Sequence, residues 1–298
     1  KIRVRDPPFE IPCTAVAATE ESMADANAGA SADGQVDVIG HILDRDYLEV
    51  PFLNAHHLID GRFDLPQLEP ILGIDLSLTR HVVWMWLASG LLITTLIACF
   101  GRPKLVPTGL ANALEAIVLF IRDEVVVPVM GQGGRVYMPF LLTTFFFILY
   151  CNLLGLVPYS ATATGNISVT VALALISFAV TQGAGIANNG LFGHLKALVP
   201  GGLPAPLLII MIPIEIIGLI AKPFALAIRL FANMIAGHIA ILVFLGLIIM
   251  LRTYWVAPVS VILAAALYLL EIFIGFVQAF IFTLLTALFV SMAAHPDH

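Results

Sequence analysis

Residues 206–250 read PLLIIMIPIEIIGLIAKPFALAIRLFANMIAGHIAILVFLGLIIM, and this stretch decides the architecture. As one helix it would be about 67 Å long, whereas a helix along the membrane normal needs only about 30 Å. Residues 255–290 form a second apolar stretch, about 54 Å long as a helix. Either each stretch breaks in two, for which 255–290 lacks turn residues, or both are steeply tilted. Because lipid mismatch alone gives a tilt of only about 20°, we predict a tilted hairpin pressed against a large partner.

The composition divides the chain into two parts. The 298 residues are 60% hydrophobic and 11% charged, whereas about 25% of residues in soluble proteins are charged. Residues 1–80 carry 6 basic and 14 acidic side chains, and residues 81–298 carry 8 and 6. We predict an acidic, partly flexible extramembrane extension over 1–80 and a membrane-embedded domain over 81–298. The acidic balance argues against nucleic acid as a partner, and the spacing of the three cysteines suggests neither a disulfide framework nor a metal site.

Three shorter spans precede the hairpin, over His81–Phe100, Tyr137–Val157 and Ser168–Ile186. Leu110–Met130 mixes charged and apolar residues and predicts an amphipathic helix at the membrane interface, with an extra span as the alternative. Residues 190–206 are rich in Gly and Pro and predict a loop. The fold class is therefore all-α, a polytopic membrane protein with about five membrane-embedded helices and one interfacial helix.

Basic residues cluster between the first two spans, at positions 102–135. The positive-inside rule places this segment on the matrix or cytoplasmic side. The N-terminus is then expected on the outer side and the C-terminus on the inner side.

Arg229 lies near the centre of the first long stretch. A guanidinium cannot become neutral, and a charge at mid-bilayer costs roughly 2.5–3.5 kcal/mol on insertion scales. Asn233, four residues on, shares its helix face. Glu215 returns to nearly that face about 21 Å away along the axis, whereas His238 is about half a turn out of phase. His238 is therefore expected to point toward another helix or a water-filled cavity.

The second long stretch carries Glu271 and Gln278, seven residues apart and so on one face. Together the polar groups suit two separate proton paths that approach one charge without joining. Simpler interpretations remain open: the carboxylates as hydrogen-bonded structural groups, His238 as a core residue or metal ligand, and the amides as packing contacts.

Four segments resemble subunit a of the F-type ATP synthase, in the order found in that family. They are FILYCNLLGLVPYS (147–160), PIE (213–215), AKPFALAIRLFANMIAGH (221–238) and LEIFIGFVQAFIFTLLTALFVS (270–291). The resemblance covers about residues 105–291. Within the family, this sequence is most similar to mitochondrial and α-proteobacterial members. It implies a mitochondrial inner membrane location, with a bacterial plasma membrane as the alternative.

The resemblance also implies a role for each polar residue. Arg229 matches the essential arginine that faces the ring of c subunits, and Asn233 and Gln278 match polar residues near it. Glu215 matches the inner half-channel, and His238 with Glu271 match the outer one. Asn152 matches a polar position of less defined role. The implied protein is a stator subunit, not an enzyme on its own, without cofactor or metal. Its implied partners are the c-ring, the peripheral stalk and other membrane-sector subunits.

The competing hypotheses are a self-contained ion or solute transporter and an intramembrane enzyme. A transporter predicts inverted repeats and Gly/Pro-broken helices. An intramembrane enzyme predicts a nucleophile or metal motif such as G-x-S-x-G or H-E-x-x-H. The sequence shows none of these patterns convincingly.

Overall fold

The computed structural model describes residues 47–49, 62–64, 79–101, 108–157, 160–197, 205–251 and 256–294. A short antiparallel ribbon pairs β1 (Tyr47–Glu49) with β2 (Arg62–Asp64). The remaining regular structure in these ranges is helical, which confirms the predicted all-α class. The helices are α3 (Arg80–Phe100), α4 (Leu110–Ile121), α5 (Val127–Met130), α6 (Met138–Gly155), α7 (Ile167–Ala197), α8 (Ala205–Leu251) and α9 (Val256–Ala294), with the short helical turns η3 (Arg122–Val126), η4 (Gly131–Val136) and η5 (Ala163–Gly165).

Five helices are long and apolar enough to cross a membrane, namely α3, α6, α7, α8 and α9. This agrees with the predicted number, and α3 begins one residue before the predicted span. Of the predicted N-terminal extension, only the ribbon and residues 79 and 80 are described. The flexibility of residues 1–80 lies outside the described residues, and their place outside the membrane stays a prediction.

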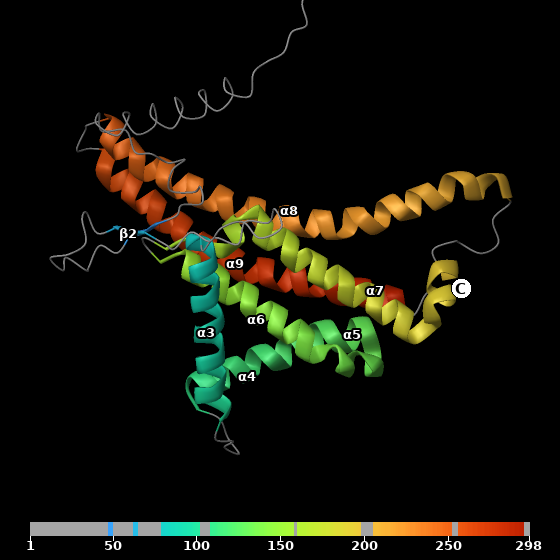
Figure 1. Cartoon of the computed structure of the whole chain (residues 1–298). Coiled ribbons are helices and arrows are strands. Elements are labelled where there is room, and N and C mark those ends of the chain that lie inside the picture. The colour runs from blue at the N-terminus through green and yellow to red at the C-terminus, as the bar shows by residue number, and fades with distance from the viewer. Residues whose placement is uncertain are drawn as a thin grey trace, which may run out of the picture.

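The two long apolar stretches form single helices. α8 continues through Pro213 and Pro223 for 47 residues, and α9 runs for 39 residues. Figure 1 shows the two helices running side by side across the molecule, with α3 standing roughly across them. The prediction of an unbroken long hairpin is confirmed, and its steep inclination is seen relative to α3.

The predicted end of the third span, Ser168–Ile186, is wrong. We expected the helix to stop at Ile186 and a loop to begin at Gly190, but α7 extends to Ala197 with a kink at Gly190. Gly190 has φ 70°, which a glycine adopts without steric cost, so the chain changes direction and a further helical turn follows. His194 then packs back on α7, with Nε2 2.7 Å from Oε1 of Gln182. Residues 198–204 lie outside the described residues.

The segment predicted as one amphipathic helix, Leu110–Met130, is helical throughout but changes to a π-turn at η3. It is not among the five helices long and apolar enough to span. Arg122 in η3 donates two hydrogen bonds to the exposed carboxylate of Asp123, at 2.7 and 3.1 Å. These bonds hold the pKa of Asp123 below its ordinary value. The location of this segment at the membrane interface stays a prediction.

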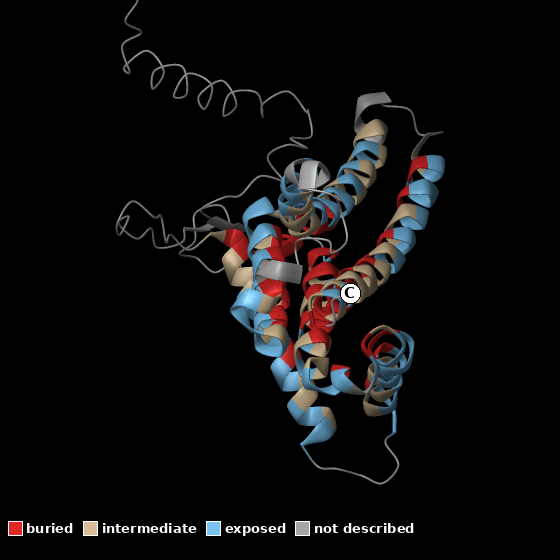
Figure 2. Cartoon of the chain, turned by 90° about the vertical axis from the view of Figure 1, so that its right-hand side faces the viewer, coloured by how far each residue is buried: buried red, intermediate tan, exposed pale blue. Residues whose placement is uncertain are grey.

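The core lies where α6, α7 and α9 meet, and residues of η3 and α5 pack into it. Phe145 of α6 packs edge-on against Phe276 of α9, with ring centroids 5.6 Å apart. Figure 2 shows the buried residues gathered in the middle of the bundle. In the apolar, membrane-spanning part of α6, 50% of the residues are buried within the chain. In the corresponding part of α8 only 11% are buried. α8 is therefore an outer helix that leaves much of its surface to neighbours.

Candidate functional site

The centre of the site is a contact between α8 and α9. Nδ1 of His238 lies 2.6 Å from Oε1 of Glu271, whose residue is only 2% exposed. Gly237 makes the approach possible, because a Cβ at this position would lie 2.7 Å from the same oxygen. A glycine inside a helix costs about 1 kcal/mol relative to alanine. Here that cost is offset by room for a carboxylate against the backbone of α8.

The other side of the His238 ring faces the end of α6 and the following turn. Nε2 lies 3.0 Å from the carbonyl oxygen of Gly155 and 2.9 Å from Oγ1 of Thr162. Because a carbonyl oxygen only accepts, the Gly155 contact requires a proton on Nε2. The short contact to Glu271 then requires one more proton, carried either by Nδ1 or by the carboxyl group. His238 and Glu271 therefore share one transferable proton.

The second carboxyl oxygen of Glu271 is placed differently. Oε2 is buried and has no hydrogen-bond partner among the described residues. A buried acceptor left unpaired costs about 1–3 kcal/mol, so such groups need an explanation such as a proton, a water or a functional contact. Oε2 is thus a buried acceptor that the described residues leave without a hydrogen bond.

A small cavity adjoins the pair. Its volume is about 30 Å³, and its polar lining comprises His81, Ser160, Thr162 and His238. A polar cavity needs roughly 10–15 Å³ to hold one water. The prediction that His238 points toward another helix or a water-filled cavity is confirmed for the helix. The cavity is large enough for one water, but its lining is mainly apolar, so a water-filled cavity stays a prediction.

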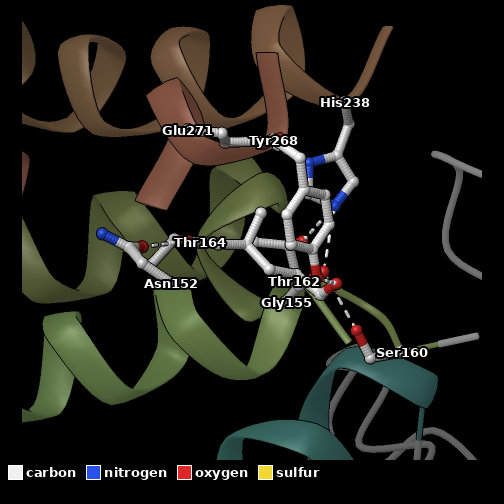
Figure 3. A network of polar contacts seen from close by, with 9 residues as sticks. Asn152, Gly155, Ser160, Thr162, Thr164, His238, Tyr268 and Glu271 are labelled. Carbon is white, nitrogen blue, oxygen red and sulfur yellow. Dashed lines mark hydrogen bonds and ion pairs between the residues drawn. The ribbon is translucent and has the colours of Figure 1, made fainter. Parts of the chain in front are cut away.

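A buried network fixes α6 against α9 beside this pair. Asn152, which is fully buried, donates from Nδ2 to the carbonyl oxygen of Gly275 at 3.0 Å. Its Oδ1 accepts from Oγ1 of Thr164 at 2.7 Å. The hydroxyl of Tyr268 donates to the carbonyl oxygen of Leu156. Figure 3 shows these groups converging from α6, α8, α9 and the turn after α6, so the network positions both ends of the His238–Glu271 contact.

A second polar contact joins α8 and α9 further along. Nδ2 of Asn233 donates to Oε1 of Gln278 at 2.9 Å, and Gln278 is 1% exposed. Glu271 and Gln278 both point toward α8, which confirms that they share one face of α9. Four of the residues selected from the sequence are thus brought together in pairs across the hairpin.

Arg229 and Glu215 are not part of these pairs. Arg229 is exposed on α8, and its guanidinium makes no hydrogen bond or ion pair with any residue that the structure describes. Glu215 is half-buried and likewise makes no such contact within the described ranges. Among the described residues, neither charged group has a polar partner.

Several residues that shape the site were not predicted from the sequence. They are His81, Gly155, Thr162, Thr164, Gly237 and Tyr268. The sequence contains only a weak indication of these residues. The turn after α6 is rich in hydroxyl side chains and free of Lys and Arg, and a glycine directly precedes His238. Neither signal indicates by itself which helix lies opposite.

Comparison with known proteins gives a consistent result. The family described as ATP synthase A chain matches residues 82–291. ATP synthase subunit a of Chloroherpeton thalassium is 53% identical over 258 residues, covering 82% of this chain and 77% of the relative. The Pelodictyon phaeoclathratiforme subunit is 47% identical over 301 residues, covering 98% and 86%, and the Myxococcus xanthus subunit is 53% identical over 234 residues, covering 76% and 77%.

These relatives are bacterial, so the expected mitochondrial or α-proteobacterial affinity is not confirmed. The family match covers all five spanning helices nearly from end to end. The same match contains both polar contacts of the α8–α9 hairpin. On these grounds, the chain belongs to the ATP synthase subunit a family.

Proposed function

We propose that this chain is the stator subunit that carries protons through the membrane sector of a rotary ATP synthase. In this proposal, protons pass through two offset half-channels on either side of Arg229. The observation that carries the proposal is the exposed guanidinium of Arg229 on α8, which has no hydrogen-bond or ion-pair partner among the described residues. It lies nine residues from His238, which forms a part-buried pair with Glu271. The partners are a ring of rotor subunits with mid-membrane carboxylates and the remaining stator subunits.

The surface around Arg229 supports contact with a rotor. Exposed residues recur every three or four positions from Ile210 to Val243, which is one face of a helix. We call this face the α8 stripe; its members are Ile210, Ile214, Ile217, Ala221, Ala225, Ile228, Ala232, Ala236, Ile239 and Val243, with Arg229 along its edge. The members of the α8 stripe one turn before and one turn after Arg229 are Ala225 and Ala232. Small residues allow helix backbones in a membrane to approach closely, so a passing rotor helix fits best beside the arginine.

The charge of Arg229 determines the protonation of an approaching carboxyl group. At about 4 Å and an effective dielectric near 20, a carboxylate gains about 4 kcal/mol from a unit positive charge. This corresponds to roughly three pKa units, enough to favour release of the proton. A rotor carboxyl group therefore gives up its proton before passing Arg229 and takes up another before it re-enters lipid. Since a guanidinium cannot relay a proton, Arg229 also blocks a direct leak.

The outer half-channel is assigned to the cavity and the His238–Glu271 pair. The shared proton of this pair moves between Nδ1 and the carboxyl group, and Oε2 of Glu271 is free to exchange it with a water or a rotor carboxylate. His238 lies about 14 Å from Arg229 along the α8 axis. A proton delivered there reaches the rotor on one side of the arginine only.

The inner half-channel is assigned to the surroundings of Glu215. Glu215 lies on the opposite side of Arg229, about 21 Å along the axis. The two channels are therefore offset along the rotor surface, and a transmembrane potential of 100 mV supplies about 2.3 kcal/mol per charge. With relatives from bacteria, the proposed location is the bacterial plasma membrane, with the N-terminus outside and the C-terminus inside.

The test replaces Arg229 in the assembled complex, reconstituted in vesicles. Arg229→Ala should reduce ATP synthesis and ATP-driven proton pumping to background and increase passive proton leak, because the barrier charge is removed. Ile220→Leu, a volume-conserving change on the same helix outside the α8 stripe, is the control and should retain activity. Coupled synthesis at the control rate in Arg229→Ala would refute the proposal. Proton or solute transport by the chain purified without a rotor would instead indicate a self-contained transporter.

A further inference from the structure

The last carbonyl groups of α6 accept hydrogen bonds from side chains of three other segments. Gly155 is the final residue of α6, and carbonyl groups at a helix end have no partner inside the helix. Its oxygen accepts from Nε2 of His238 on α8 at 3.0 Å and from Oγ of Ser160 in the following turn at 3.0 Å. The carbonyl oxygen of Leu156 accepts from the hydroxyl of Tyr268 on α9. The end of α6 is therefore an acceptor site that lies against the His238 ring.

Thr162 provides a second acceptor for the same ring nitrogen. It is 7% exposed, and its Oγ1 lies 2.9 Å from Nε2 of His238 and 3.3 Å from the carbonyl oxygen of Gly155. A hydroxyl group has one proton to donate and a carbonyl oxygen only accepts, so the Thr162 proton is directed to Gly155. A lone pair of the hydroxyl then faces Nε2. Both contacts of Nε2 are therefore acceptors for one proton on this nitrogen.

Two glycines let the partners of His238 reach its ring from opposite sides. A Cβ at Gly155 would lie 2.7 Å from Cβ of Thr162, so a larger residue there would displace the threonine. On the other side of the ring, Gly237 leaves space of the same kind for Glu271. The two ring nitrogens thus face different groups in a fixed arrangement, with acceptors at Nε2 and an ionisable carboxyl group at Nδ1.

We propose that Thr162 is a positioning residue that, together with the Gly155 carbonyl group, keeps Nε2 of His238 protonated in every state of the His238–Glu271 pair. This inference rests on the proposed function. Nδ1 is then the one ring nitrogen that gains and loses a proton, and it faces Glu271. The transferable proton stays on the side of the ring where the carboxyl group lies, and no step breaks the Nε2–H bond.

Thr162 also favours the charged form of the ring. A hydrogen bond to a charged group is stronger than one to a neutral group, and the negative end of the α6 dipole acts in the same direction. The described part of the turn after α6 contributes no ionisable side chain, and the ionisable residues of α7 lie beyond its kink at Gly190. The ionisable groups that the described residues place around the ring are Glu271 and Tyr268 on α9 and His81 and Arg80 on α3. Without the Thr162 hydroxyl, the pair should therefore release its proton at a lower pH.

The experiment compares Thr162→Val with Thr162→Ser in the reconstituted complex, measuring passive proton flow against outer pH. Valine keeps the shape of threonine without the hydroxyl, whereas serine keeps the hydroxyl. We expect the midpoint of the profile to move down by about one pH unit in Thr162→Val and to stay at the wild-type value in Thr162→Ser. Thr170→Val makes the same change at a buried threonine whose hydroxyl donates to its own helix, and it should leave the profile unchanged.

An unchanged midpoint in Thr162→Val, or an equal displacement in Thr162→Ser, would overturn the inference. A second measurement follows the ring directly, by nitrogen NMR of the wild-type complex with isotope-labelled histidine. The His238 signal is identified by its loss in His238→Gln. Nε2 should remain protonated both above and below the midpoint. A neutral ring with its proton on Nδ1 would overturn the inference even if the Thr162 variants fail to assemble.

Arg229→Ala separates this inference from the proposed function. Normal coupling in Arg229→Ala would refute the proposed function, whereas the NMR measurement reports on the His238 ring alone. If Arg229→Ala abolishes coupling while the midpoint in Thr162→Val is unchanged, only the role of Thr162 is wrong.

Discussion

Arg229 and His238 lie nine residues apart on the same helix, yet their polar contacts within the chain differ. His238 is engaged on both ring nitrogens, by Glu271 on one side and by Gly155 and Thr162 on the other. Arg229 is exposed and has no hydrogen-bond or ion-pair partner among the described residues. The described residues therefore satisfy the polar atoms of His238 but not the charge of Arg229.

The difference follows from the phase of α8. Half a turn separates the two residues, so one side of the helix packs on α9 and the turn after α6, and the other side forms the α8 stripe. A charge in a membrane is expensive without compensation, so Arg229 at the edge of the stripe favours a partner that compensates its charge. We call the side of α8 that packs on α9 the paired face and the side with the α8 stripe the open face. Substitutions on the two faces are therefore expected to have different consequences.

The largest expected effect concerns the paired face. Glu271→Gln should slow proton flow about a hundredfold, because the amide can still bond to His238 but cannot accept the shared proton. The complex should remain assembled, since the residue has the same shape. The measurement is passive proton flow through the reconstituted complex between pH 5 and 8, with the rotor content determined in parallel. Flow that matches the wild type over this range would show that the pair is structural.

The next effect concerns the open face. Ala232→Leu adds bulk to the α8 stripe beside Arg229 without touching the core. Overpacking a close contact costs about 1–3 kcal/mol, so coupled ATP synthesis should fall about tenfold. Thermal unfolding of the isolated subunit in detergent should not change. If synthesis stays normal, or if the isolated subunit loses stability, the stripe is not the rotor-facing surface.

The smallest effect tests the close approach at Gly237. Gly237→Ala places a methyl group 2.7 Å from Oε1 of Glu271, so the carboxylate must move away from His238. We expect proton flow to fall roughly threefold, a small part of the full proton-transfer contribution. Gly218→Ala is the matched control on the same helix, because a Cβ there meets nothing within 4 Å. Equal flow in both variants would mean that the spacing of the pair is not limiting.

Several features of the fold follow from local pattern and were predicted from the sequence. The unbroken 47-residue α8 was predicted because no loop residues interrupt it, and Pro213 and Pro223 are accommodated inside the helix. The shared direction of Glu271 and Gln278 follows from their spacing of seven residues. The end of α7 was not predicted, because the sequence does not show that Gly190 would kink the helix instead of ending it.

The sequence by itself determined which segments form the spanning helices, the length of the two long ones, and the face of the helix on which a charged group lies. These properties depend on hydropathy and helical period, which act over neighbouring residues. Only the tertiary structure decided that His238 contacts a carbonyl 83 positions away, that His81 lies across the same cavity, and that Arg229 is left open. Such contacts depend on how distant segments pack together, and short-range pattern contains no information about which segments meet.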